Sequence, residues 1–156
     1  MIPQPPDLVR GLSPEDASSV LVLGIPIVLA AGEVLFDLGA EAESLYLIQR
    51  GRIALTLPMH VAGRAEDIVI EEHVPGQMLG WSALVPPHRF TLKATAPLPT
   101  EVLAFRRTEL LAYCAVNSKV GQVVALNIAE VIGRRLQVFQ AMWLRQMQRV
   151  VSHVHA

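Results

Sequence analysis

The residues best suited to binding a small anion lie in one stretch, residues 75–89. Gly76 and Gly80 permit left-handed backbone, and the apolar run after Gly80 is long enough for one helical turn. Such a turn leaves free backbone N–H groups, which could hold an anion together with the Ser82 hydroxyl and the Arg89 guanidinium. The same pattern fits a buried connector between strands, and the stretch taken alone favours that simpler interpretation.

The composition predicts one domain with an apolar interface. Hydrophobic residues make up 52% of the 156 residues and charged residues 17%, a large apolar share for a soluble monomer. The longest nearly uncharged run, residues 20–32, is shorter than the roughly 18 residues of a membrane-spanning helix. We therefore expect a subunit interface and no membrane association. No signal-peptide pattern follows Met1, so we expect a cytoplasmic protein.

Cysteine and histidine usage argues against a metal centre and against an enzyme. Cys114 is the single cysteine, which excludes an intrachain disulfide and a multi-cysteine metal site. Metal-dependent enzymes of the cupin type need clustered histidines and an acid on facing strands, whereas His60, His73 and His88 are scattered and the other two histidines lie in the tail. No nucleophile motif is present, and no glycine-rich loop ends in Lys-Ser or Lys-Thr. We expect no catalytic residue and no bound metal, and a cupin-like enzyme is the least favoured alternative.

The first two thirds of the chain read as an arm, a helix and a series of strands. Residues 1–12 are predicted as an arm, and Ser13-Pro14 begins a predicted helix that runs to about Gly24. Short strands follow at residues 25–29, 34–36, 44–49, 52–57, 67–73, 90–96 and 101–105. The turns between them include a tight hairpin at Arg50-Gly51 and a loop at residues 62–66. This spacing predicts a mainly β fold, an antiparallel sandwich or barrel with flanking helices.

Helical patterning begins after Phe105. Thr108 is expected to cap a short helix through Cys114, and a long helix is predicted from about Val120 to Val151. A heptad seam runs along the long helix: Ala125, Ala129, Ile132, Leu136, Phe139, Trp143, Gln146 and Val150. A second apolar line lies beside it, broken by Arg135: Val124, Ile128, Val131, Val138 and Met142. One line can pack on the β domain while the other meets a second copy, so we predict a parallel homodimer.

The charged residues give no signal for nucleic acid. The long helix carries four arginines, which we interpret as a solvated face: Arg134, Arg135, Arg145 and Arg149. The net charge of −1 exerts no general attraction on nucleic acid or acidic lipid.

The order of these elements resembles a cyclic nucleotide-binding domain, in particular the effector domain of the catabolite activator/Fnr family of bacterial regulators. The resemblance is carried by residues 31–36 (AGEVLF), Gly39, residues 44–48 (SLYLI), Gly51 and the approach Pro75-Gly76 to Gly80, and it covers roughly residues 12–149. It implies one domain over residues 1–156. A helix and a jelly-roll β-roll (a double-stranded β-helix) would occupy residues 12–106, and a short helix and a long dimerisation helix would occupy residues 107–152.

The resemblance also implies a phosphate-binding cassette. Its candidate ligand-binding residues are Gly80, Trp81, Ser82, Ala83, Leu84, His88, Arg89 and, from the long helix, Phe139. Nucleotide-binding members have an acid after the cassette glycine that accepts the ribose hydroxyl, and Trp81, which stands there, cannot accept a hydrogen bond. The family arginine that pairs with the cyclic phosphate falls at His88 or Arg89, and the sequence leaves both open. Phe139 either stacks on a flat ring or packs in the dimer seam; we favour the seam.

Two functions follow from the resemblance. The first is a dimeric ligand-sensing module in signal transduction, responding to a cyclic nucleotide or another small anion. The alternative is an interaction protein that kept the fold and dimer but lost the ligand. The family's DNA-reading helix-turn-helix would follow the long helix, beyond Ala156, so we expect no direct DNA binding. A protein partner is one possible output.

Overall fold

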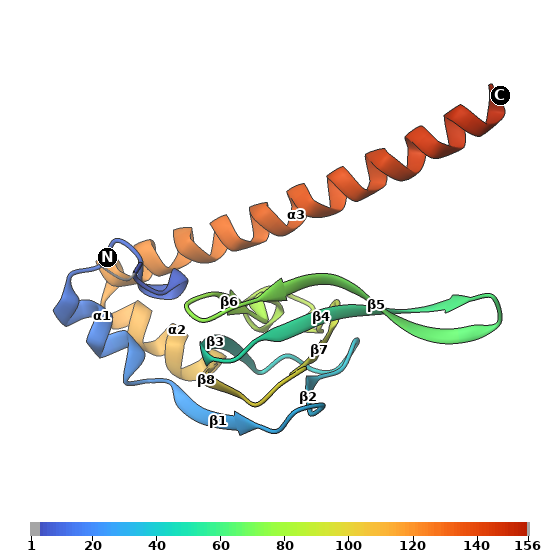
Figure 1. Cartoon of the computed structure of the whole chain (residues 1–156). Helices are drawn as coiled ribbons and strands as arrows, with labels where there is room; N and C mark the ends of the chain where they lie inside the picture. The colour runs from blue at the N-terminus through green and yellow to red at the C-terminus, as the bar shows by residue number, and fades with distance from the viewer. Residues whose placement is uncertain (1–3, 156) are drawn as a thin grey trace.

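Two antiparallel sheets form the body of the molecule in the computed structural model, which describes residues 4–155 (Figure 1). The described strands are β1 (Ile25–Leu29), β2 (Val34–Phe36), β3 (Ser44–Arg50), β4 (Ile53–Val61), β5 (Arg64–His73), β6 (Met78–Leu79), β7 (Lys93–Thr95) and β8 (Thr100–Arg106). One sheet has the order β1-β8-β3-β6 and the other β2-β7-β4-β5. The predicted antiparallel roll with flanking helices is confirmed.

The core lies between the two sheets and is formed by β-branched, leucine and aromatic side chains. Leu45 of β3, Ile53 of β4 and Phe105 of β8 are fully buried. The predicted hairpin between β3 and β4 is present at Gly51, whose φ is +82°. A Cβ at this position would lie 2.6 Å from the Pro99 carbonyl oxygen, so both the backbone angle and the close approach require glycine here.

The hairpin of β4 and β5 is longer than predicted. Val61 pairs with Arg64, so the loop that we expected over residues 62–66 is a turn of two residues. Ala62 and Gly63 both adopt positive φ, +51° and +78°, as a tight hairpin turn requires. Alanine rarely takes this conformation, which explains why the sequence pattern did not predict the turn.

The first helix and the N-terminal arm cover one end of the roll. Helix α1 (Pro14–Leu21) begins as predicted: the Ser13 hydroxyl accepts a hydrogen bond from the Asp16 backbone N–H at 3.1 Å. It ends at Leu21, before the predicted Gly24. A Cβ on Gly24 would lie 2.9 Å from the Cβ of Leu103, so the chain at this point already passes directly over β8. Part of the predicted arm forms a short 3-10 helix, η1 (Asp7–Val9), and is buried; residues 1–3 of that arm lie outside the described residues.

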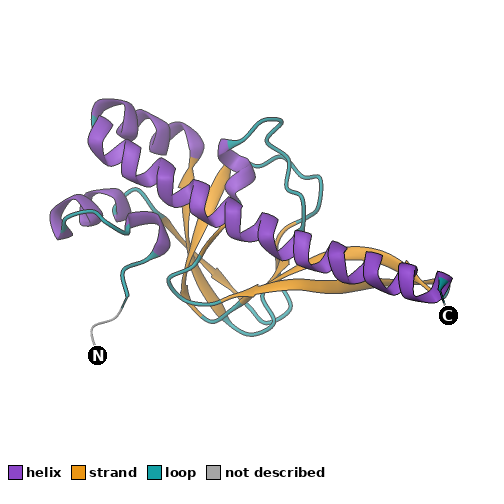
Figure 2. Cartoon of the chain, turned by 90° about the horizontal axis from the view of Figure 1, so that it is seen from above, coloured by secondary structure: helices purple, strands orange, loops and turns teal. Residues whose placement is uncertain are grey.

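Two helices complete the described chain. Helix α2 (Arg107–Val116) begins one residue before the expected cap: Arg106 is the N-cap and makes no side-chain cap hydrogen bond, so the prediction for Thr108 was wrong. Helix α3 (Ser118–Val154) has 37 residues and is therefore about 55 Å long. It leaves the body in the same direction as the β4–β5 hairpin (Figures 1 and 2). None of the described helices is both long and apolar enough to cross a membrane.

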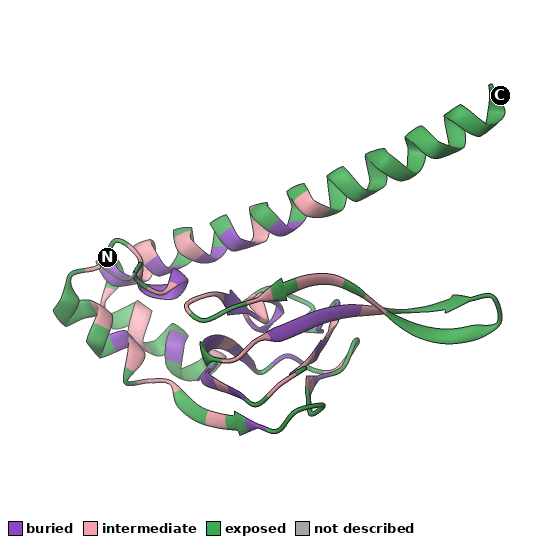
Figure 3. Cartoon of the chain, in the orientation of Figure 1, coloured by how far each residue is buried: buried purple, intermediate pink, exposed green. Residues whose placement is uncertain are grey.

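Burial along α3 changes at Arg135. The N-terminal half of the helix buries one stripe, Val120, Val124, Ile128, Val131 and Arg135. Every residue from Phe139 to His155 is exposed, and the distal half of α3 is accordingly drawn wholly in the exposed colour (Figure 3). Arg135 interrupts the second apolar line, as predicted, at the point where the helix leaves the roll.

A cluster of charged groups holds α3 on the roll at that point. The interpretation of Arg135 as part of a solvated face was wrong, because it is only 7% exposed. Its Nε lies 2.5 Å from Oε2 of Glu71 on β5. His73 Nε2 lies 3.4 Å from the same Glu71 oxygen and 3.3 Å from Arg135 Nη2. Within residues 4–155 this is the one ion pair between α3 and a sheet, since the other ion pairs of α3 join it to Asp7 and Arg10 at η1.

The cluster predicts a pH-dependent contribution to stability. The pKa of Glu71 lies below its ordinary value of 4.5, chiefly because the His73 side chain hydrogen-bonds it, with a further contribution from the charge of Arg135; burial acts in the opposite direction. A carboxyl whose pKa falls on folding stabilises the protein above its unfolded-state pKa, and this contribution is lost as the pH falls through the folded-state pKa.

Glu71→Gln should therefore destabilise the protein at neutral pH, by about 1–3 kcal/mol, because Arg135 would stay buried without its counter-charge. The difference from the unmodified protein should shrink as the pH falls below the ordinary carboxyl pKa. Urea denaturation at several pH values measures both effects, with Glu66→Gln on the exposed hairpin as the control. A Glu71→Gln penalty that stayed the same down to acid pH would contradict this role for the carboxylate.

Candidate functional site

The stretch from Gly80 forms the single helical turn that the sequence predicts. A 3-10 helix, η2 (Trp81–Leu84), follows Gly80, whose φ is +81°, and ends at Val85 in extended conformation before Pro86. Strand β6 leads into this turn and pairs with Tyr46 and Leu47 of β3. We call residues 80–89 the cassette.

Gly80 is required at its position for two separate reasons. Its φ is in the left-handed region, and a Cβ would lie 3.2 Å from Tyr46 Cδ2 and 3.4 Å from Phe90 Cε1. Gly80→Ala should destabilise the protein by about 1–2 kcal/mol from the backbone alone, with an added packing cost. Gly32→Ala is the matched control, because Gly32 has φ +88° but open space around it. Thermal unfolding of both variants should show the larger loss for Gly80→Ala; equal losses would show that the Tyr46 and Phe90 contacts do not matter.

The two basic residues of the cassette point to different places. His88 Nδ1 lies 3.2 Å from the Ser82 carbonyl oxygen, so this nitrogen is the donor and closes the cassette on itself. Arg89 pairs through its backbone with Glu41, and its Nη1 donates to the Gly39 carbonyl oxygen at 3.2 Å. Arg89 is exposed. An anion at the cassette would therefore compete with a backbone carbonyl for either residue.

Aromatic rings fill the roll beside the cassette glycine. The rings of Phe36 and Phe90 stack with centroids 3.7 Å apart and planes 9° from parallel, and Tyr46 lies 5.9 Å from Phe36. Phe36 and Phe90 are 8% and 5% exposed. Burial, with a smaller effect of the Glu43 charge, raises the pKa of Tyr46, so the phenol stays neutral. The surroundings of Gly80 are thus apolar and are formed by stacked aromatic rings.

The remaining candidate residues lie in three environments. Ser82 and Ala83 are buried in the cassette turn, and Trp81 is half-buried against the hydrophobic core. Leu84 borders a groove with α2 and α3. Phe139 is 37% exposed on α3, in line with Leu136 and Trp143. The structure therefore brings Gly80–Leu84 and His88 together, and it places Arg89 and Phe139 on other surfaces.

Arg107 was not predicted, yet it connects the cassette to the helices. Its Nη1 donates to the carbonyl oxygens of Ala42 and Ala83, both at 3.0 Å, and its backbone N–H donates to Glu43 at 2.9 Å. Ala42 and Ala83 are fully buried. One side chain at the start of α2 thus ties the cassette turn to that helix. A signal was present in the sequence, because a basic residue in the first turn of a helix opposes the helix dipole and indicates another role.

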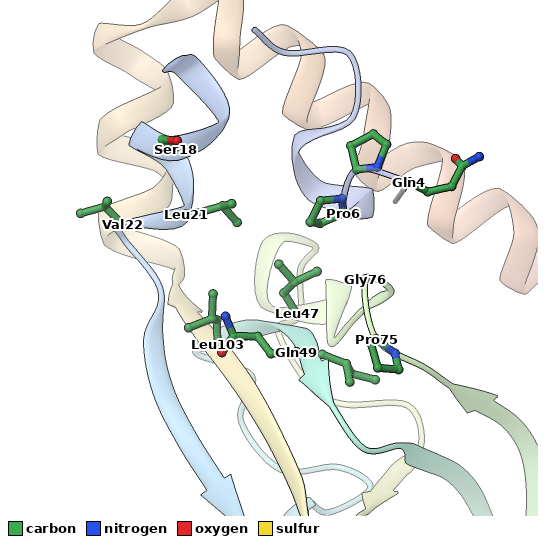
Figure 4. A pocket seen from close by; sticks show the side chains of 12 residues that line it. Gln4, Pro6, Ser18, Leu21, Val22, Leu47, Gln49, Pro75, Gly76 and Leu103 are labelled. Carbon is green, nitrogen blue, oxygen red and sulfur yellow. The ribbon is translucent and has the colours of Figure 1, made fainter. Parts of the chain in front are cut away.

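A large apolar cavity lies away from the cassette. It has a volume of about 890 Å³ and is lined mainly by apolar side chains of the arm, α1, β3 and β8, including Leu21, Leu47 and Leu103 (Figure 4). None of the cassette residues lines it. Among residues 4–155, no group of three or more histidine, cysteine or acidic side chains is placed to hold a metal ion.

Comparison with known proteins identifies the family. The model of the cyclic nucleotide-binding domain matches residues 26–117, more than half of the chain. The chain belongs to the cyclic nucleotide-binding domain family. Among curated proteins, no match was found.

Several solved structures share the fold. The catabolite activator protein of Thermus thermophilus is similar with a TM-score of 0.74 and 26% identity, over 91% of this chain and 63% of that protein, so this chain spans less than two thirds of its length. A putative cyclic nucleotide-binding protein from Geobacter metallireducens has a TM-score of 0.64 and 24% identity, over 83% of this chain and 94% of that protein. The c-di-GMP-responsive global regulator CLP of Xanthomonas campestris has a TM-score of 0.76 and 14% identity, over 92% of this chain and 71% of that protein. The expected resemblance to the catabolite activator family is confirmed.

Proposed function

We propose that the chain is a homodimeric regulatory module of signal transduction, acting in the cytoplasm, with α3 as the subunit interface. The observation that carries this proposal is a broad apolar face on the exposed half of α3. Its members are Leu136, Phe139, Trp143, Met147, Val150, Val151 and Val154, and each is exposed by 37% or more. At 3.6 residues per turn they fall within a sector of about 120°.

This face extends from residue 125 to residue 154, and Gln140 interrupts it within the same sector. Ala125, Ala129 and Ile132 lie in the same sector nearer the roll, whereas Arg134 and Arg145 lie on the opposite side. The exposed apolar residues follow the predicted heptad seam to Trp143 and then continue through Met147, beside the polar Gln146. The steps from Phe139 to Trp143 and from Trp143 to Met147 are both four residues long, where a heptad pattern alternates four and three. Two successive steps of four locally unwind a coiled coil, so the distal pair of helices would run nearly straight.

A parallel arrangement suits the distribution of sizes along the face. In a parallel pair the small residues Ala125 and Ala129 face their own copies close to the roll, where the two bodies need close approach. The bulky residues Phe139 and Trp143 each face their own copies farther out, in the part of α3 where every residue is exposed. An antiparallel pair would set the alanines against residues of the projecting half and leave gaps.

For the roll itself we propose that cyclic AMP and cyclic GMP are not ordinary ligands. Trp81 replaces the acid that the family uses for ribose, and the Phe36–Phe90 stack fills the space beside Gly80. Loss of the hydrogen bond between that acid and the ribose hydroxyl costs about 1–3 kcal/mol of binding free energy, or roughly ten- to hundredfold in affinity. The module would then act through protein contacts, with a protein partner as its output.

A second candidate function, sensing of a cyclic nucleotide or another small anion, is favoured by one observation. The cassette keeps its turn: left-handed Gly80, one 3-10 turn and a closing His88–Ser82 hydrogen bond. Binding of a ligand there would shift the cassette relative to α2 and α3 through Arg107.

Calorimetric titration with cyclic AMP and cyclic GMP separates the two functions. The ligand-free proposal predicts no saturable heat at micromolar concentrations. Saturable binding that is lost in Arg89→Ala, but kept in Arg64→Ala at the exposed hairpin tip, would establish the sensor instead. Neither variant should alter the dimer, because neither side chain lies on α3.

A further inference from the structure

An apolar groove separates the cassette from the two C-terminal helices. We call it the cassette groove; its volume is about 300 Å³. Its lining comes from the end of the cassette, from α2 and from α3: Leu84, Val85, Leu110, Leu111, Cys114, Gly121, Val124, Ala125, Ile128, Ala129 and Ile132. All the side chains of this lining are apolar except the thiol, so the groove suits an apolar occupant.

The groove opens on the proposed dimer face. Ala125, Ala129 and Ile132 belong to the seam and also line the groove. Gly121 forms its floor beside α2: a Cβ there would lie 2.9 Å from the Cβ and carbonyl oxygen of Cys114. A second helix that packed along the seam would therefore pass directly over the groove.

The heptad pattern determines which partner side chain meets the floor of the groove. With Ala125 and Ile132 at d positions, Gly121 is a g position and Leu126 an e position. In a parallel pair the g residue of one helix faces the following e residue of the other, which sets Gly121 against the partner's Leu126. Leu126 is 63% exposed, so most of this large apolar side chain is uncovered in the single chain.

We propose that the partner's Leu126 inserts into the cassette groove, which is thus a composite site that only the dimer completes. The inference rests on the proposed parallel dimer. Leu84 and Val85, where the cassette turn ends, line the same groove. The cassette of one subunit therefore contacts the helix of the other, and any movement of the cassette alters the packing between subunits.

A cross-link across the groove tests this placement. Cys114 is the only native cysteine and lines the groove, so Leu126→Cys would place a second thiol in reach of it only across the dimer. We expect a short bismaleimide to convert most of this variant to a band of doubled mass. The double variant Leu126→Cys/Cys114→Ser should remain uncross-linked, because e positions of a parallel pair lie on opposite flanks of the seam. Glu130→Cys, on the outer flank of α3, is the second control.

Sedimentation of the same samples distinguishes the possible failures. Leu126 is exposed, so its replacement should leave the fold intact. A dimeric Leu126→Cys variant that does not cross-link to Cys114 would overturn the composite groove and leave the proposed function standing. A monomeric unmodified chain would overturn both.

Discussion

The double variant Leu136→Asp/Phe139→Asp is expected to sediment as a monomer. These side chains are 57% and 37% exposed in the single chain and lie at the middle of the apolar face of α3. Burial of each in a dimer would contribute about 1.5 kcal/mol or more, on both copies, or about 6 kcal/mol in total. The loss corresponds to roughly 10⁴-fold weaker association, and the introduced like charges weaken it further. Sedimentation velocity measures the change.

The matched control introduces the same charges on the flank of the helix. Gln137→Asp/Gln148→Asp alters two exposed residues of α3 that lie outside the apolar face, so this variant should remain a dimer. Circular dichroism of both variants checks that α3 is retained. An unchanged mass for Leu136→Asp/Phe139→Asp would remove the argument for α3 as the interface.

Arg107→Met is expected to destabilise the fold by about 3–5 kcal/mol, the largest loss for any single change considered. The variant leaves the carbonyl oxygens of Ala42 and Ala83 buried without their donor, and hydrogen bonds from a charged group contribute about 1.5–3 kcal/mol each. Arg106→Met is the control, since Arg106 is exposed and makes no side-chain cap hydrogen bond. Urea denaturation measures the difference between the two.

Hydrogen exchange locates the effect of Arg107→Met. If Arg107 couples the cassette to α2, this variant should accelerate the exchange of the amides of residues 81–85, relative to the unmodified protein, more than it accelerates the exchange of the amides in the β3–β8 pairing. Uniform acceleration over the whole roll would show a general loss of stability and no specific coupling to the cassette.

Local backbone requirements explain which parts of the fold could be predicted from the sequence. Glycines at Gly51 and Gly80 mark positive φ directly, and the Ser13-Pro14 pair marks the start of α1, so these features were predicted correctly. The turn at Ala62 was missed because alanine gives no local signal for φ +51°. The end of α1 was misplaced because the close approach of Gly24 to β8 is a tertiary contact.

The same distinction holds for the site. The cassette turn follows from Gly80 and the proline after Val85, whereas the direction of the Arg89 side chain depends on the loop at Gly39, far away in the sequence. Arg107 and the Glu71–Arg135 pair were missed for the same reason, since their partners lie on other elements. Sequence patterns identify residues with special backbone, and long-range pairs of charged groups become visible only in the folded chain.

The mass of the unmodified chain in solution decides whether α3 is a subunit interface. Sedimentation equilibrium over a range of micromolar concentrations should give about 34 kDa, the mass of two chains of 17.0 kDa each. A mass of 17.0 kDa that persists across the whole range would rule out the homodimer, because the apolar face of α3 would then remain exposed to water in the native protein.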